Sequence, residues 1–248
     1  MFIDAHCHIE YYGDEEIVSV IERARTKGVK VILENGMNPE KNKRVLFLAE
    51  KYPELKACLG IYPSDVEQMT DEQIDKELAF IEKNKNNIIA IGEVGLDFKS
   101  ESADKERQIK TFEKFIRLAI KLDKPIVVHS RKAEKECIEL LKNHEAKKVL
   151  MHCFSGKLSL LSDIVANGWM ISIPTSVKNS EHFQKVVSLT PIHNLLAETD
   201  SPFLHPDKEL NNEPANVIES YKKIAEIKKM PLKKIEEHLE KNFERLVG

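Results

Sequence analysis

Short apolar runs rich in β-branched residues alternate along the chain with longer segments in which apolar residues recur every three or four positions. The short runs predict β-strands, and the longer segments predict amphipathic helices between them. Eight strands are expected in this way, at Phe2–Ala5, Val29–Glu34, Lys56–Gly60, Ile88–Gly92, Pro125–His129, Lys148–His152, Trp169–Ile173 and Asn194–Glu198.

The helical pattern is clearest in the segment Asp104–Leu122. Its apolar stripe, which we expect to pack in the core, comprises Ile109, Phe112, Ile116, Ala119 and Ile120. Thr70 and Gln73 have the spacing of a capping box, which predicts that a helix begins there. Further helices are expected over Asp71–Lys85, Ala215–Lys229 and Pro231–Leu246.

Repeated alternation of strand and helix implies parallel strands joined by right-handed crossovers. Eight such strands close naturally into a barrel, so the predicted fold class is α/β, a (β/α)8 TIM barrel, with a doubly wound open sheet as the alternative. One barrel of ordinary size would use all 248 residues. Because no repeat, low-complexity stretch or Pro/Gly-rich linker marks a boundary, residues 1–248 are predicted to form a single domain.

The composition is typical of a folded enzyme, with 42% hydrophobic and 32% charged residues. Because no apolar run is long enough to cross a membrane and no secretory signal pattern is present, we expect a cytoplasmic location and no membrane partner. The cysteines are scattered without a CxxC pair, which favours reduced thiols in a core over a disulfide framework. They are Cys7, Cys58, Cys137 and Cys153.

Candidate chemistry begins at the end of the first predicted strand, with the sequence His6-Cys7-His8. The two-residue period of a strand turns both imidazoles to one side and the cysteine to the other. Imidazole is a common ligand for transition metals, and two imidazoles on one strand end form a chelate. A chance pair is at least as common, so this motif is weak by itself.

More polar residues of the same kind lie at the ends of later strands: Glu93, His129, His152 and Asp200. Each could be a core histidine, a helix cap or an ion-pair partner. In a barrel, however, the carboxyl ends of the strands converge on one face, where active sites lie. Together with the first pair, these residues predict a metal centre. Five other histidines are expected at the surface, with His205 as the exception because it follows the last strand: His144, His182, His193, His205 and His238.

Six segments, in order along the whole chain, carry a resemblance to a known family: Ile3–His8, Ala90–Asp97, Val128–Arg131, His152–Gly156, Glu198–Pro202 and Asn212–Pro214. On these motifs the chain resembles the TatD-type deoxyribonucleases or hydrolases, which are metal-dependent barrel enzymes. The resemblance implies two divalent metal ions, which could be Zn, Mn, Mg, Ni or Fe. It assigns His6, His8 and Asp200 to one ion. It assigns His129 and His152 to the other, with Glu93 bridging the two.

Three positions depart from the pattern of this family. Tyr62 stands in Gly60-Ile61-Tyr62-Pro63 where a histidine is common, Lys132 replaces an aspartate, and Asn211 replaces an arginine. These loops are expected to contact the substrate, so the changes bear on the choice of substrate more than on hydrolysis itself. The residues expected to contact substrate are Tyr62, Arg131, His205, Asn212 and Glu213.

The resulting prediction is a metal-dependent hydrolase of ester bonds, a deoxyribonuclease that cleaves phosphodiesters with a water activated by two cations about 3.5–4 Å apart. Asp200 is the expected general base, and Glu93 is the second catalytic residue. The formal net charge of −3 argues against a broad basic nucleic-acid surface, but bound metal ions can supply positive charge locally.

Two other functions remain open. The same activated water could attack a carbonyl, in an aminoacyl-tRNA, an amide or a lactone. The barrel could instead be a non-catalytic metal-binding scaffold, which the complete ligand set disfavours. The substrate partner is therefore DNA or another phosphoester, with aminoacyl-tRNA as the alternative, and no protein partner is implied.

Overall fold

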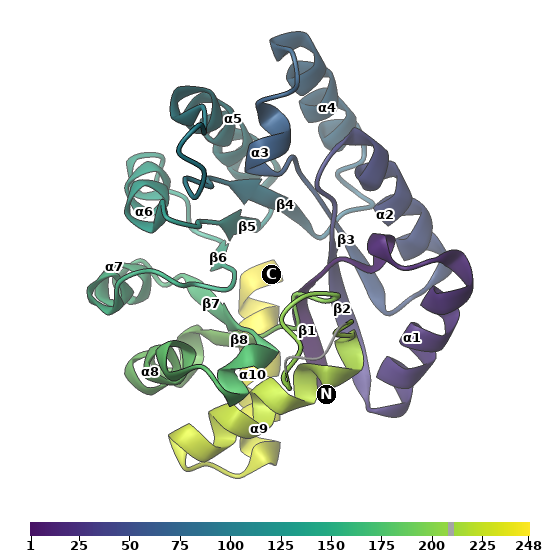
Figure 1. Ribbon diagram of the computed structural model, residues 1–248, viewed down its shortest axis with the longest axis vertical. Coiled ribbons are helices and arrows are strands. Elements are labelled where there is room, and N and C mark those ends of the chain that lie inside the picture. The colour runs from purple at the N-terminus through teal and green to yellow at the C-terminus, as the bar shows by residue number, and fades with distance from the viewer. Residues whose placement is uncertain (208–210) are drawn as a thin grey trace.

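In the computed structural model, which describes residues 1–207 and 211–248, eight strands form one parallel sheet in the order of the chain (Figure 1). The strands are β1 (Phe2–Cys7), β2 (Val29–Asn35), β3 (Leu55–Leu59), β4 (Ala90–Gly95), β5 (Ile126–His129), β6 (Val149–Met151), β7 (Met170–Ile173) and β8 (Leu195–Ala197). Sequential order without a reversal is that of a barrel. The prediction of a (β/α)8 TIM barrel is confirmed, and the doubly wound sheet is excluded.

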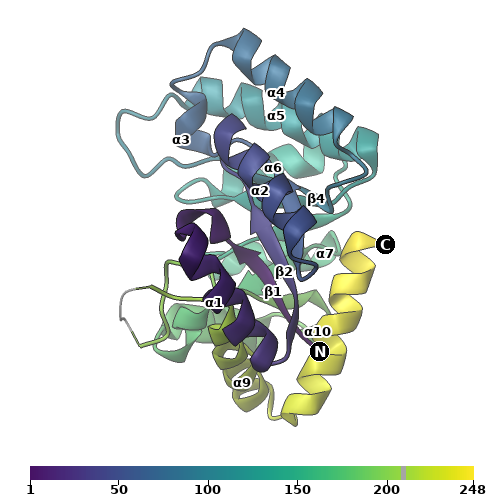
Figure 2. The ribbon, with the colours of Figure 1, turned by 90° about the vertical axis from the view of Figure 1, so that its right-hand side faces the viewer.

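Helices surround the sheet (Figure 1). They are α1 (Asp14–Thr26), α2 (Pro39–Lys51), α3 (Pro63–Val66), α4 (Asp71–Lys83), α5 (Lys105–Leu122), α6 (Glu134–Asn143), α7 (Leu161–Ala166), α8 (Glu181–Leu189), α9 (Val217–Lys228) and α10 (Leu232–Val247). Figure 2 shows α10 beside the N-terminus, where the ammonium of Met1 lies 3.0 Å from Glu240 Oε2. Among the described residues, none of the helices has the length and apolar character to traverse a lipid bilayer.

The boundaries differ from the predicted ones in particular places. The fourth strand runs past Gly92 to Gly95, so Glu93 lies within the strand instead of after it. Thr70 and Gln73 form both hydrogen bonds of the predicted capping box.

In α5 the prediction that Ile120 packs in the core is wrong, because this side chain is 48% exposed. The buried face of α5 is centred on Phe112, Phe115 and Ile116, and Ile120 lies beyond its edge.

The core fills the barrel and the space between the sheet and the helices. Residues of β4 and β6 are buried along their whole length, because helices cover the outer face of the parallel sheet while side chains fill the inner one. All four cysteines are free thiols, and Cys7, Cys58 and Cys137 are fully buried. The prediction of thiols in a core holds for these three, whereas Cys153 is only half-buried.

The seam between β8 and β1 closes the barrel just beyond the ends of these strands. The N–H of Asp200 donates to the carbonyl of His6 at 2.9 Å, and the N–H of His8 donates to that of Ser201 at 2.8 Å. Deeper in the seam, the buried carboxylate of Asp4 accepts from the N–H of Thr199 at 2.8 Å and from its hydroxyl at 2.6 Å. Main-chain and side-chain hydrogen bonds therefore fix the two strands that carry the first and last candidate ligands.

We expect Thr199→Val to lower the free energy of unfolding by about 1–3 kcal/mol, because a buried oxygen of Asp4 loses its hydroxyl partner while the size of the side chain is kept. Urea denaturation followed by circular dichroism measures this loss. Thr190→Val is the matched control, because the buried hydroxyl of Thr190 has no hydrogen-bond partner within the described residues. An equal loss in both variants would contradict the role of this contact in the seam.

Candidate metal centre

The first pair of histidines lies at the carboxyl end of β1. His6 is within the strand and His8 follows it, and their Nε2 atoms are 3.1 Å apart. Cys7 points the other way, with Sγ 3.4 Å from Glu34 Oε2. The carbonyl oxygen of Asn35 lies 3.0 Å from His8 Nδ1, on the opposite side of the ring from Nε2. The strand period thus places both imidazoles on one side, with their Nε2 atoms free to share a ligand.

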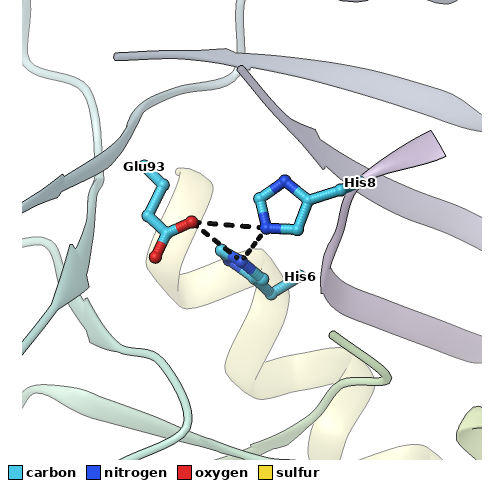
Figure 3. Close-up of side chains that lie close together, drawn as sticks. All are labelled: His6, His8 and Glu93. Atoms are coloured by element: carbon cyan, nitrogen blue, oxygen red, sulfur yellow. Dashed lines mark hydrogen bonds and ion pairs between the residues drawn. The ribbon is translucent and has the colours of Figure 1, made fainter. Parts of the chain in front are cut away.

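Glu93 of β4 contacts histidines through both of its carboxylate oxygens. Oε2 lies 3.4 Å from His6 Nε2 and 3.3 Å from His8 Nε2. Figure 3 shows these three side chains pointing toward one another. Oε1 lies 2.7 Å from His129 Nδ1 and 2.9 Å from His152 Nε2. One carboxylate therefore joins the histidine pair of β1 to the pair at the ends of β5 and β6, which is the geometry that a bridging ligand requires.

Asp200, three residues past β8, adds a second carboxylate to the β1 side of the site. Its Oδ1 lies 3.6 Å from the Nε2 atoms of both His6 and His8. Its backbone adopts the left-handed conformation, with φ of 54°, which aspartate tolerates better than most residues. Asp200 thus approaches the same two imidazoles as Glu93, but from the end of β8, whereas Glu93 belongs to β4.

The residues fit a pair of divalent cations by the chemistry of their donor atoms. In the described part of the chain, ligand atoms lie close enough to share an ion in three groups: His6 with His8 and Glu93, His6 with His152 and Asp200, and Glu93 with His129 and His152. Imidazole nitrogen combined with carboxylate oxygen suits zinc, manganese, nickel and iron. Six side chains from five strand ends supply these donors.

The electrostatics of the site favour positive charge between these side chains. Burial alone would raise the pKa of Glu93, but the charges of His152 and His6 outweigh it and hold that pKa well below its usual range. Burial would likewise lower the pKa of His152, but the charges of Glu93 and Glu198 raise it well above its usual range. Burial raises the pKa of Asp200 to about 7, against the opposing charges of His152 and His8.

Two carboxylates behind the histidines have no counterpart in the sequence predictions. Asp97 Oδ2 lies 3.2 Å from His129 Nε2 and accepts a 3.0 Å hydrogen bond from the Tyr62 hydroxyl. Glu198 Oε2 lies 3.6 Å from His152 Nδ1. Such partners fix the orientation of a ligating imidazole. Asp97 stands in a motif that carried the family resemblance, but no spacing in the sequence marks it as a partner of His129.

A pocket of about 560 Å³ opens above the candidate ligands. It is lined by His8, Tyr11, Met37, Tyr62, Glu93, His129, Ser130, Arg131, His152, Cys153, Ser155, Phe183, Asp200, Phe203 and Leu204. Tyr62 and Arg131 are two of the five predicted substrate contacts, and both lie in this lining. Sequence reasoning missed the aromatic and apolar part of the lining, because most of these residues lie outside the strands and long helices, where no periodic signal marks them.

The other three predicted substrate contacts lie outside this lining, and the described residues give them other partners. Asn212 is fully buried, and its side-chain amide donates to Thr199 O at 2.8 Å. Glu213 forms an ion pair with Arg23, with 2.6 Å between Oε2 and Nη2. His205 Nδ1 accepts from the backbone N–H of Asp207 at 3.1 Å. Asn212 and Glu213 therefore contact other segments of the chain, whereas the contact of His205 lies within its own loop, and a role of these three residues in substrate binding stays a prediction.

Known proteins with similar sequences span nearly the same length. An uncharacterized metal-dependent hydrolase of Methanocaldococcus jannaschii, MJ1582, is 38% identical over 242 residues, covering 97% of this chain and 94% of the relative. Deoxyribonuclease TATDN3 of Homo sapiens is 34% identical over 256 residues, covering 98% and 93%. The crystal structure of YjjV, a TatD homologue from Escherichia coli, has a TM-score of 0.94 at 28% identity, covering 99% of this chain and 97% of that one.

The sequence model described as TatD related DNase matches residues 3–248, from within β1 to the end of the chain. The match contains every residue of the candidate metal centre in the motifs that carried the resemblance. The predicted family and the predicted enzyme class, a metal-dependent hydrolase, are confirmed. The chain belongs to the family of TatD-related DNases.

Proposed function

We propose that this protein is a deoxyribonuclease that hydrolyses phosphodiester bonds with two divalent cations at the carboxyl end of its barrel. The observation that carries the proposal is the position of Glu93, whose two carboxylate oxygens each meet a separate pair of histidines. The name of the human relative, a deoxyribonuclease, supports DNA as the substrate. The wide pocket above the histidines gives a phosphoester access to them.

We assign the residues to the ions according to the side of Glu93 on which they lie. His6, His8 and Asp200 would hold one cation, His129 and His152 would hold the other, and Glu93 would be shared. When bound by these residues, a pair of divalent cations would supply Lewis acidity and would lower the pKa of a coordinated water towards neutrality. The imidazole of His129 keeps Nδ1 towards Glu93, because Asp97 and Tyr62 occupy its Nε2 side.

Hydrolysis forms a P–O bond to the oxygen of a water molecule and breaks the P–O bond to the leaving alcohol. Asp200 is the general base that accepts the proton of the water, and it returns that proton to the leaving oxygen. The choice between the two carboxylates follows from access, since the Asp200 side chain is 17% exposed whereas that of Glu93 is 2% exposed. Glu93 lies at the floor of the pocket with little exposed surface, so its role is to hold the histidines and the ions together.

The remaining alternatives have less support. The comparisons do not favour an aminoacyl-tRNA or another carbonyl substrate, and the intact set of candidate ligands disfavours a non-catalytic scaffold. The cytoplasmic location and the single-domain organisation stay predictions. The number and identity of the metal ions are part of the proposal.

We expect the purified protein to bind two Mn²⁺ or Zn²⁺ ions per chain and His129→Ala to bind one, because this substitution removes a ligand from one side of Glu93 only. Glu93→Gln should weaken both sites. Isothermal titration calorimetry after chelation, together with elemental analysis, counts the ions. His144→Ala is the control, because His144 pairs with Glu113 on the helical surface and should leave the count at two. An unchanged count in His129→Ala would refute its assignment.

We expect cleavage of single- or double-stranded DNA in the presence of Mg²⁺, Mn²⁺ or Zn²⁺, and a loss of kcat of about 10²–10⁴-fold in Asp200→Asn, since that variant lacks the general base and a charged ligand of one cation. Gel electrophoresis of labelled oligonucleotides measures the rate. Aminoacyl and lactone esters, offered in parallel, test the carbonyl alternative. No cleavage of DNA with any ion would end the nuclease proposal, and tight metal binding without any ester hydrolysis would favour the scaffold.

We expect Arg131→Ala to raise KM for DNA by about tenfold with a smaller effect on kcat, because the exposed guanidinium at the pocket can bind a phosphate that does not react. Steady-state kinetics at fixed ionic strength measures both constants. Lys132→Ala is a matched control, since Lys132 is the next residue, is exposed and carries the same charge, but is not in the pocket lining. Equal effects of the two substitutions would indicate general charge attraction only.

A further inference from the structure

Two large aromatic side chains stand exposed on the rim of the pocket, beside His8. Tyr11 is 47% exposed and Phe203 is 48% exposed. Their ring centroids are 5.7 Å apart with an interplanar angle of 75°, and they lie 6.0 Å and 6.3 Å from the centroid of the His8 ring. Single exposed apolar side chains are common on protein surfaces, but neighbouring ones that border a pocket are typical of a binding site.

Both aromatic residues are anchored to the backbone of the candidate metal ligands. The N–H of Phe203 donates to the carbonyl of Asp200 at 2.8 Å, and the N–H of Tyr11 donates to that of His8 at 3.4 Å. The hydroxyl of Tyr11 contacts Met37 Sδ at 3.4 Å, and Lys41 Nζ lies 3.3 Å from the ring centroid. The backbone of both residues is therefore tied to that of the candidate ligands, and the ring of Tyr11 has further contacts with Met37 and Lys41.

The exposed aromatic pair and Arg131 lie on different sides of the pocket. The aromatic pair follows β1 and β8, on the side of His6, His8 and Asp200, whereas Arg131 follows β5, next to His129. A polynucleotide carries a flat apolar base and an anionic phosphate in each unit. Aromatic side chains bind any base through its π-face, and a cation binds the phosphate. This arrangement would place one nucleoside beside the aromatic pair and a phosphate beside Arg131.

We propose that Tyr11 and Phe203 form a base-binding subsite, which stacks the nucleobase next to the reacting phosphodiester. The inference rests on the proposed function and adds to it the part of the substrate that the aromatic pair recognises. Because stacking requires no hydrogen bond to a base edge, the subsite accepts all four bases. The base positions the bond to be cleaved over the floor of the pocket, where the charged side chains lie.

A comparison of two substrates tests the subsite. One is a short single-stranded oligonucleotide, and the other is a phosphodiester chain of equal length in which tetrahydrofuran replaces every nucleoside. We expect the wild-type protein to prefer the first in kcat/KM by about tenfold, and Tyr11→Ala and Phe203→Ala to reduce this ratio to about one. Tyr11→Phe and Phe203→Tyr, which keep the rings, should retain the preference.

Phe47→Ala is the matched control, because Phe47 is an aromatic residue of α2 that is 54% exposed and lies in a different hollow. It should keep the wild-type ratio. A loss of rate in Tyr11→Ala and Phe203→Ala that is equal for both substrates would overturn the proposal, since it would indicate a structural role. An unchanged ratio with unchanged rates would overturn it as well.

Binding without catalysis separates this proposal from the proposed function. The probe is 2-aminopurine deoxyribonucleoside monophosphate, whose fluorescence is quenched when its base stacks. We expect quenching by the wild-type and Phe47→Ala proteins, and an approximately tenfold higher Kd for Tyr11→Ala and Phe203→Ala. Quenching by a protein that cleaves no phosphodiester would retain the subsite and reject the nuclease. Cleavage of DNA without quenching would retain the nuclease and reject the subsite.

Discussion

A carboxylate buried among histidines has to be compensated, and Glu93 imposes this requirement on the whole carboxyl face of the barrel. Its side chain is 2% exposed, and an ion taken out of water at such a position costs several kcal/mol unless opposite charge lies close by. His8 supplies that charge at one oxygen, and His129 and His152 supply it at the other, whereas burial holds the pKa of His6 well below its usual range. Cations held between these groups would meet the same requirement, so the cost of burying Glu93 and the affinity for metal have one physical origin.

The seam between β8 and β1 links this site to the stability of the fold. The same backbone atoms that close the barrel belong to His6, His8 and Asp200, and the carboxylate of Asp4 fixes the approach of the last strand through Thr199. The hydrogen bonds that close the barrel therefore also position Asp200. A barrel that failed to close would also lose the contact between Asp200 and the two imidazoles.

The pocket shows how a chain with a net charge of −3 can receive an anionic substrate. Positive charge need not cover the surface if cations bind at the floor of the pocket and Arg131 stands at its edge. The exposed aromatic rings of Tyr11 and Phe203 offer binding energy of another kind, which does not depend on charge and is little affected by salt. These two contributions lie on different sides of the same opening, so substrate orientation and substrate affinity can be set by separate residues.

The sequence by itself determined the barrel, since strand and helix alternate with distinct hydrophobic periods, and it placed His6 and His8 on one side because side chains alternate along a strand. It could not place Asp97 behind His129, because their contact spans 32 positions and depends on how neighbouring strands are set in the sheet. The sequence also led to the prediction that Asn212 contacts substrate, whereas packing buries that side chain. The local hydrophobic period decides on which side of a strand a residue lies. Which residues of different strands come into contact is decided only when the barrel closes.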